Sequence, residues 1–287
     1  MEATGKRYVL HPSRSDEFTL WHISDIHWMN AACTENRINR DLKKIEDDPY
    51  ALWTGGGDYC EFINAKDPRF DASVLPAWVP GSALADLGAF SCKHIMDKFA
   101  PIKNKCLGLG MGNHELKYAK ANTNIGMHER LCEAMGVPNL GYSGFFDLVF
   151  VRTSEVDIPT LSPTFKYEQR HKAYGFRIFT HHGAGAAQTK GGRINRLVRF
   201  MEDFEADIYL IGHVHGRTGE RVQRIGANST CTKLEDRDSI GVISGSYLKT
   251  YAQGIISYAE PMGWRPSVLG AARIKIIPDK RKFYTEI

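Results

Sequence analysis

The sequence predicts an α/β fold, because short apolar segments rich in β-branched and aromatic residues alternate with segments of helical periodicity. Residues 18–24 and 50–54 are two such apolar segments, and residues 34–47 between them carry apolar side chains at helical spacing. Strand, helix and strand in this order form a β-α-β unit. A carboxylate follows each predicted strand, Asp25 after the first and Asp58 after the second.

The helix between these two strands is predicted from a pattern with clear signals at both ends. Ile38, Leu42 and Ile45 fall on one face of it. The hydroxyl of Thr34 can cap its N-terminus. Pro49 follows its last turn, where a proline prevents the helix from continuing.

The middle of the chain repeats the alternation of helix and strand. Residues 85–99 have helical spacing, and residues 105–110 form an apolar strand that is interrupted by glycines. The strand is followed by Gly112-Asn113-His114-Glu115. Residues 125–135 are then predicted to form a short helix that ends at Gly136.

The second half of the chain is richer in strands. The predicted elements are strands over residues 145–151 and 173–180, a helix over residues 192–206, and strands over residues 207–211, 239–248 and 272–277. Histidines follow two of these strands, His181 and His182 after residues 173–180, and His213 and His215 after residues 207–211. Polar side chains therefore collect at strand ends in this half as well.

Two segments lack a clear period and are interpreted as insertions, residues 62–84 and residues 154–172. No internal repeat, low-complexity tract or linker divides the chain. We therefore expect a single domain over residues 1–287.

Composition is typical of a globular protein, with 43% hydrophobic and 24% charged residues. A net charge of +4 permits anionic substrates. It does not by itself indicate a nucleic-acid-binding protein, whose basic residues should form a clear stripe. The six cysteines form no CxxC pair, and residues 1–18 contain no apolar segment of a signal peptide. No apolar run reaches the roughly 18 residues of a membrane span. We expect a cytoplasmic protein with reduced thiols and no membrane partner.

The residues at the strand ends are typical ligands of divalent and transition metals. In open layered folds the loops after parallel strands converge on one edge, so these side chains are expected to meet there. The triplets Asp25-x-His27 and His213-x-His215 each place two ligands on one side of an extended segment. Two metals about 3.5–4 Å apart need a bridging carboxylate, for which Asp58 is the natural candidate.

The set and order of these motifs resemble the calcineurin-like metallophosphoesterase superfamily. The matching blocks are Asp25-x-His27, Gly57-Asp58-x-x-Glu61, Gly112-Asn113-His114-Glu115, His181-His182 and Gly212-His213-x-His215. The resemblance implies a four-layer α-β-β-α sandwich of two mixed sheets. It also implies a dinuclear centre of two divalent or transition metal ions such as Mn, Fe or Zn, between which the sequence cannot choose.

The resemblance also implies a role for each matching residue. The first metal would be held by Asp25, His27 and His215, the second by Asn113, His181 and His213, and Asp58 would bridge them. His181 is favoured over His182 because the superfamily commonly places the ligand first in such a pair. His114 matches the catalytic histidine, and Glu61 is its expected orienting partner.

The implied activity is hydrolysis of a phosphodiester or phosphomonoester by in-line attack of a metal-bridging hydroxide. His114 would stabilise the transition state or protonate the leaving alkoxide. Phe62 stands where protein Ser/Thr phosphatases of the superfamily carry arginine, which disfavours a phosphoprotein substrate. We expect phosphodiesters or small phosphorylated substrates. The glycine-rich loop before Lys190 and Arg193 can contribute to an anion site. Arg196 and Arg199 could extend this site or could instead form a solvated face of the helix.

Two other functions are compatible with the sequence. A nuclease could bind a nucleic-acid strand through basic residues between aromatic ones, namely Arg152, Lys166, Arg170 and Lys172 with Phe165, Tyr167 and Tyr174, although these could equally form an exposed hairpin. A non-catalytic metal-binding scaffold would be expected to have lost ligands or the catalytic histidine. All seven ligand positions and His114 are present, which favours an enzyme.

Overall fold

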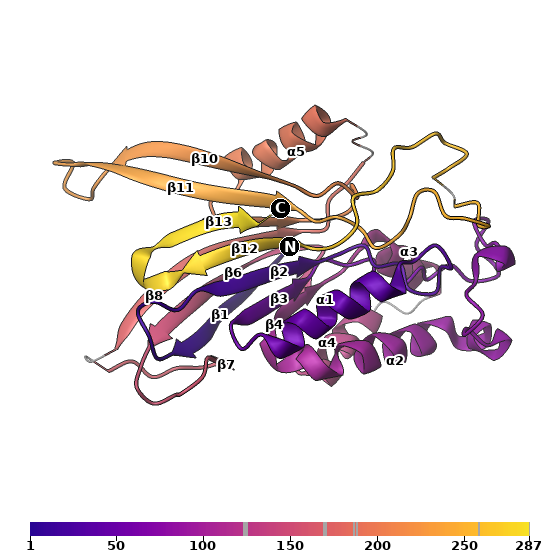
Figure 1. Ribbon diagram of the computed structural model, residues 1–287, viewed down its shortest axis with the longest axis horizontal. Coiled ribbons are helices and arrows are strands. Elements are labelled where there is room, and N and C mark those ends of the chain that lie inside the picture. Colours follow the sequence, from indigo (N-terminus) through magenta and orange to yellow (C-terminus); the bar gives the residue numbers. More distant parts are fainter. Residues whose placement is uncertain (123–125, 169–170, 186, 188, 258, 287) are drawn as a thin grey trace.

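Two mixed β-sheets pack face to face, and helices cover the outer face of each sheet (Figure 1). The computed structural model describes residues 1–287 except residues 123–125, 169–170, 186, 188, 258 and 287. This arrangement confirms the expected α/β fold and the four-layer α-β-β-α order.

The smaller sheet has six strands and contains the β-α-β unit predicted from the sequence. In spatial order its strands are β13 (Lys282–Glu286), β12 (Ala272–Ile277), β2 (Phe18–Ile23), β3 (Ala51–Gly55), β4 (Cys106–Gly110) and β5 (Asn139–Gly141). Strands β2 to β5 are parallel, so their carboxyl ends lie at one edge of the sheet. The loops that carry Asp25 and Asp58 and the short connection to Asn113 therefore leave the sheet side by side.

The larger sheet has seven strands of mixed direction. In spatial order they are β10 (Thr218–Ala227), β11 (Leu234–Ile243), β9 (Ile208–Ile211), β8 (Lys172–His181), β6 (Ser143–Arg152), β1 (Glu2–His11) and β7 (Thr160–Ser162). Strands β8 and β9 are parallel, so the two histidine motifs leave this sheet together. Strands β10 and β11 form a hairpin that extends past the other strands (Figure 1).

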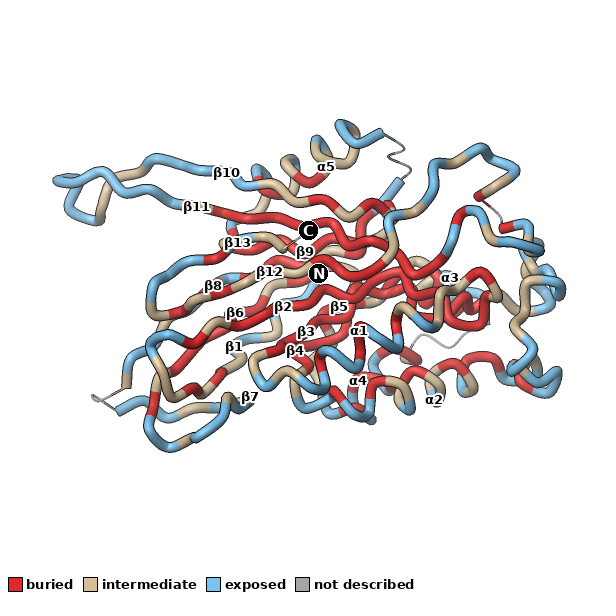
Figure 2. Tube along the Cα trace, in the orientation of Figure 1, coloured by how far each residue is buried: buried red, intermediate tan, exposed pale blue. Residues whose placement is uncertain are grey.

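Apolar side chains fill the three spaces between the four layers (Figure 2). Between the sheets, Phe18 and Leu20 of β2 pack with Phe150 of β6 and its neighbours. Helices α1 (Glu35–Asp47), α2 (Leu87–Phe99) and α4 (Met127–Met135) cover the smaller sheet, and α5 (Lys190–Asp203) covers the larger one. Among the described helices, none combines the length and the apolar character that crossing a membrane requires.

Some local expectations need correction. Asn113 and His114 do not lie in a loop but begin helix α3 (Asn113–Ala121). The helix expected over residues 125–135 begins at Met127, and position 125 lies outside the described residues. Of the two expected insertions, residues 62–84 contain short 3₁₀ turns, and residues 154–172 contribute strand β7 to the larger sheet.

Candidate metal centre

The loops after β2 and β3 are tied together so that two carboxylates face the same point. The backbone N–H of Asp25 donates to Gly57 O at 3.0 Å, and that of Ile26 donates to Asp58 O at 2.9 Å. Asp25 is fully buried and Asp58 is 2% exposed. Two buried carboxylates this close together are costly unless cations or hydrogen bonds compensate their charge.

The turn that carries Asp58 leaves no room for side chains on its neighbours. A Cβ atom on Gly57, which has a φ of +90°, would lie 2.2 Å from Gly112 N, and one on Gly112 would lie 2.1 Å from Asp58 Oδ1. The buried carboxylate of Glu115 accepts hydrogen bonds from the backbone N–H groups of Asp58, Tyr59 and Gly112 at 2.8–3.0 Å. Glu115 therefore fixes the loop of one ligand to the helix that carries another.

One cluster of ligand atoms joins the first and the last motif. Asp25, His27 and His215 each offer one atom, and these atoms lie within 4.8 Å of one another. Asp25 Oδ1 is 3.3 Å from His215 Nε2, while Asp25 Oδ2 accepts from the N–H of His213 at 2.8 Å. Within the described part of the chain, His27 Nε2 is buried without a hydrogen-bond partner. The structure therefore brings together the three residues that were predicted to hold the first metal.

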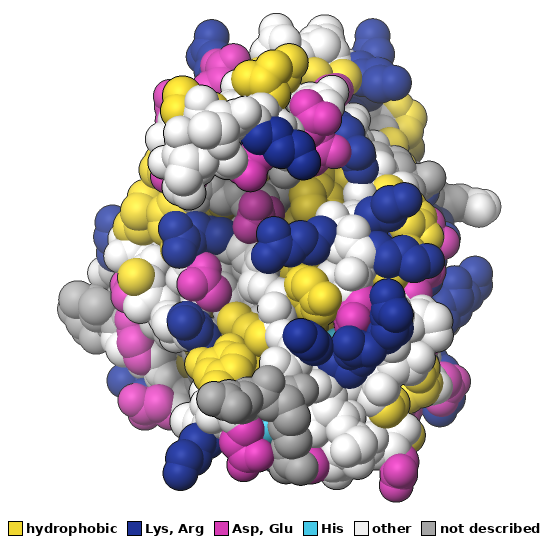
Figure 3. All heavy atoms as spheres, turned by 90° about the vertical axis from the view of Figure 1, so that its left-hand side faces the viewer, with side chains coloured by type: hydrophobic (Ala, Val, Ile, Leu, Met, Phe, Trp, Pro, Cys, Tyr) yellow, Lys and Arg dark blue, Asp and Glu magenta, His cyan; other side chains and the backbone are white. Residues whose placement is uncertain are grey.

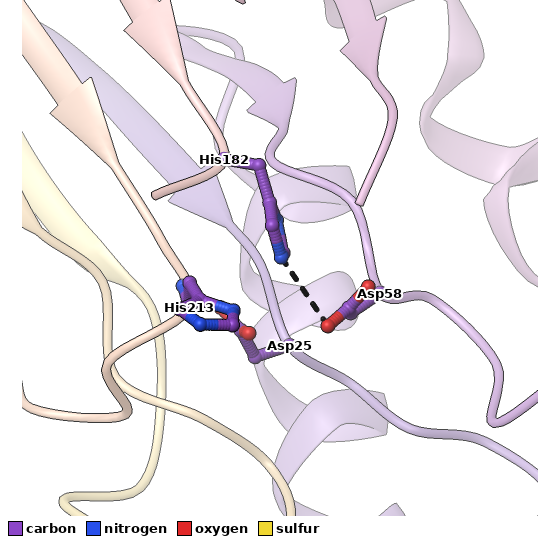
Figure 4. Close-up of side chains that lie close together, drawn as sticks. All are labelled: Asp25, Asp58, His182 and His213. Atoms are coloured by element: carbon purple, nitrogen blue, oxygen red, sulfur yellow. Dashed lines mark hydrogen bonds and ion pairs between the residues drawn. The ribbon is translucent and has the colours of Figure 1, made fainter. Parts of the chain in front are cut away.

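A second cluster is formed by Asp25, Asp58, His182 and His213 (Figure 4). His182 Nε2 is 3.3 Å from Asp58 Oδ2 and 3.1 Å from Asn113 Oδ1. The grouping differs from the expected one, because Asp25, and not Asp58, belongs to both clusters. The bridging role of Asp58 stays a prediction.

The structure places His182, not His181, among these ligands, contrary to the expectation from the sequence. Successive side chains along a strand point to opposite faces, so neighbouring histidines at the end of β8 diverge. The ring of His181 packs on Phe200 of α5, with ring centroids 4.6 Å apart, and its Nδ1 accepts from the N–H of Gly183 at 2.7 Å. His182 is 2% exposed and points into the cluster.

The donor set fits a cation. His182 Nδ1 donates to Gly56 O at 2.7 Å, so the neutral ring presents the lone pair of Nε2 to the oxygens of Asp58 and Asn113. The Asn113 amide oxygen likewise points toward acceptors; turned by 180°, its nitrogen would instead donate to His213 Nδ1 at 2.8 Å. Lone pairs that converge in this way repel one another unless a positive charge lies between them.

The pKa values of the clustered side chains also indicate that the site fits a cation. Burial lowers the pKa of His182, but the charge of Asp58 outweighs this effect and raises the pKa to about 10. Burial likewise opposes the charge of Glu61 at His27, whose pKa is raised to about 9. Burial alone would raise the pKa of Asp58, yet His182 and His114 hold it well below its usual range. The site therefore favours positive charge, as a proton or as a metal ion.

His114 and Glu61 lie beside the first cluster, and His27, Glu61 and His114 form a third group of neighbouring ligand atoms. His114 Nδ1 donates to the backbone carbonyl of Glu61 at 2.6 Å, whereas the Glu61 carboxylate is 3.6 Å from it and 3.2 Å from His27 Nδ1. The main chain of Glu61 is thus the closer orienting partner of His114. The His114 backbone N–H also donates to Asp58 Oδ1 at 2.8 Å.

A cleft of about 260 Å³ opens above these residues. Its floor contains His27, Asp58, Asn113, His114, His213 and His215. Its wall contains Arg193 of α5 and residues from the segment after β11, namely Lys249, Trp264 and Arg265. The sequence singled out Arg193 but not the other three, since their segment has no recognisable motif and only the fold brings it to the cleft.

The basic and aromatic segment considered for strand binding lies elsewhere. Strands β6 and β8 pair so that Ser143 faces His181 at the metal end and Arg152 faces Lys172 at the other end. Nine residue steps of about 3.3 Å separate these ends by roughly 30 Å. Figure 3 shows the molecule from the side away from the metal clusters, where Lys and Arg are mixed with Asp, Glu and hydrophobic side chains. Arg170 lies outside the described residues.

Comparison with solved structures matches the chain to a predicted phosphoesterase from Streptococcus pneumoniae TIGR4, with 11% identity, a TM-score of 0.33, and coverage of 94% of this chain and 99% of that chain. It also matches a double mutant of Vps29 from Entamoeba histolytica, with 10% identity, a TM-score of 0.37, and coverage of 94% and 98%. No family model and no curated protein matches. Similarity this low carries no argument about activity.

Proposed function

We propose that the protein is a metal-dependent phosphoesterase with a dinuclear centre. The observation that supports this most directly is that two Asp/His clusters share the buried Asp25 and place His27, Asp58, His213 and His215 on the floor of one cleft beside His114. Asp25, His27 and His215 would hold one cation, and the other would be held by Asp58, Asn113, His182 and His213. When bound, two such cations polarise phosphate oxygens and lower the pKa of a water nucleophile.

His114 is the residue proposed to act on the leaving group. Its Nδ1–H is held by the carbonyl of Glu61, which fixes the ring and directs Nε2 away from that carbonyl. The ring lines the cleft, so a proton carried by Nε2 is available to the oxygen of the departing alcohol. Glu61 acts as a positioning residue for both His114 and His27.

We favour phosphodiesters over phosphomonoesters, and a nuclease remains the nearest alternative. The basic residues near Arg152 do not support it, because they lie at the far end of the β6–β8 pair from the clusters. Basic residues in the wall of the cleft itself, including Arg193 and Arg265, are the ones positioned to meet an anionic substrate.

The test is hydrolysis of bis-(p-nitrophenyl) phosphate and p-nitrophenyl phosphate by metal-stripped protein to which Mn²⁺ is added. We expect turnover that depends on the metal and is faster with the diester. His114→Ala should lower kcat by about 100-fold or more with metal content unchanged, since general acid catalysis contributes roughly 10²–10⁴-fold. His94→Phe, which alters a histidine outside the cleft, is the matched control. Two bound metal ions without turnover of either ester would support the scaffold interpretation instead.

A further inference from the structure

We propose that the wall of the cleft is a subsite for a second anionic group of the substrate, formed by Arg193, Lys249 and Arg265 beside the indole of Trp264. The inference builds on the proposed function, because the metal clusters would take the first phosphate. It assigns the substrate class as a nucleotide that carries a second phosphate next to the phosphoester at the metals.

The first support is uncompensated positive charge. Arg193, Lys249 and Arg265 line the same cleft as the metal clusters, and Asp58 is the one carboxylate among the described lining residues. Among the ion pairs of the described residues none involves these three cations, whereas Arg152, Arg177 and Arg221 each pair with an aspartate. Like charges that converge without partners are unfavourable unless an anion binds between them.

The second support is the way in which Arg193 is locked beside a metal ligand. Its Nε donates to Ala187 O at 3.0 Å, which leaves the terminal nitrogens of the guanidinium for another acceptor. The guanidinium lies against Gly216, where a Cβ atom would come within 2.3–2.5 Å of the Arg193 side chain. Because Gly216 directly follows His215, any larger residue there would displace Arg193 from the wall of the cleft. Burial lowers the pKa of Arg193, and the nearby charge of Arg265 lowers it further.

The third support is that the opposite side of the subsite is held in place. The hydroxyl of Thr250 donates to Arg265 O at 3.1 Å and accepts from Ser267 N at 3.1 Å, so Lys249 and Arg265 approach the cleft from one connected structure. The N–H of Val268 donates to the carbonyl of the ligand His215 at 3.3 Å. The cations are therefore attached to the metal loops by hydrogen bonds rather than carried on a free surface segment.

The size and lining of the cleft indicate what the second anion belongs to. A volume of about 260 Å³ lies just below the roughly 300–1,000 Å³ of typical small-molecule sites, so the cleft takes a ligand no larger than one nucleotide or the end of a single strand. Guanidinium groups recognise phosphate oxygens with paired hydrogen bonds, and an indole provides a face on which a nucleobase can stack. A nucleotide with two phosphates would place its second anion among these cations and its base beside Trp264 in the wall of the cleft.

The experiment measures binding by calorimetry to the metal-loaded full-length protein. Thymidine 3′,5′-bisphosphate should bind at least about tenfold more tightly than thymidine 5′-monophosphate. The double variant Arg193→Gln/Arg265→Gln should lose this preference and keep its metal content. Arg40→Gln, which alters an exposed arginine of α1 outside the cleft, should retain the preference.

Equal binding of the two nucleotides by the wild type, or an unchanged preference in the double variant, would overturn the subsite. Hydrolysis of bis-(p-nitrophenyl) phosphate by the same preparation would then leave the phosphoesterase proposal standing. Conversely, a preference for the bisphosphate in a protein without hydrolytic activity would support the subsite alone. A trinucleotide that binds more tightly than the bisphosphate identifies a strand as the source of the second phosphate, and equal binding identifies a mononucleotide; both support the subsite.

Discussion

Adjacent histidines at the end of β8 allow the metal centre to be tested with a matched pair of variants. His182 faces Asp58 and Asn113, whereas the ring of His181 packs on Phe200 outside the clusters. We expect His182→Ala to lose one metal ion, and His181→Ala to keep the full metal content. Both variants replace a histidine by alanine, at adjacent positions, so they have the same amino-acid composition and differ only in which ring is removed.

The size of the effect follows from the number of ligands that remain. Loss of a residue that only orients a ligand already costs about 10–100-fold in metal affinity. Loss of His182, a direct ligand, should therefore cost at least roughly 100-fold, or about 2.8 kcal/mol at 1.4 kcal/mol per tenfold. The variant also leaves Gly56 O without its 2.7 Å donor, which costs a further 1–3 kcal/mol or so in folding free energy. His181→Ala loses ring contacts of a partly exposed side chain and the 2.7 Å acceptor of the Gly183 N–H, together worth about 1–2 kcal/mol.

Metal content per chain is measured by mass spectrometry after dialysis against a fixed free concentration of Mn²⁺. Calorimetric titration of the stripped proteins then gives the affinity of each site. Circular dichroism establishes that both variants are folded, so that lost metal is not mistaken for lost structure. If His181→Ala loses a metal ion and His182→Ala does not, the assignment of the second cluster is wrong.

Two further predictions concern the backbone conformation of His215 and the partly buried ring of His94, which lies away from the clusters. In metal-free protein, His215→Gly should be more stable to urea than His215→Ala by about 1 kcal/mol, because the φ of +47° at this position disfavours alanine; equal stability would contradict this. Burial, assisted by the charge of Lys98, lowers the pKa of His94 to about 4, so the folded state binds fewer protons there than the unfolded chain does. Stability should fall as the pH drops from about 6.5 toward 4, by about 1–2 kcal/mol after allowance for partial exposure. His94→Phe, which can keep the ring stack on Trp78, should flatten this pH dependence in urea titrations.

The sequence predicted the β-α-β core well because local and tertiary signals agree there. The strand expected over residues 18–24 is β2, Phe18–Ile23, and the helix expected over residues 34–47 is α1, Glu35–Asp47. The strands are apolar runs that are buried on both faces, and a proline separates the helix from the second strand. These signals determine the type and the bounds of each element. The meeting of Asp25 and Asp58 at one edge of the sheet could be predicted for the same reason, since each directly follows a well-predicted strand or its turn.

The hairpin of β10 and β11 could not be predicted in the same way. Its outer half, from Arg221 to Asp238, is mostly polar, and its few apolar residues, such as the exposed Ile225 and Leu234, do not alternate, so no period of two distinguishes strand from loop. In this outer half the pairing depends mainly on hydrogen bonds between the two strands, because most of its residues are exposed. Likewise, nothing in the sequence decides between His181 and His182, because a shift of one residue reverses which ring faces the metals.

Backbone strain is concentrated at the candidate ligands. Of nine described non-glycine residues with positive φ, five are candidate ligands, namely Asp25, His27, Asp58, His213 and His215. Each such residue costs of order 1 kcal/mol or more, so together they use a sizeable part of the roughly 5–15 kcal/mol that stabilises a domain. Glycine would relieve the strain but has no ligand atom. The fold therefore accepts a less stable rim so that side chains turn inward at strand ends, and metal binding would return part of that stability.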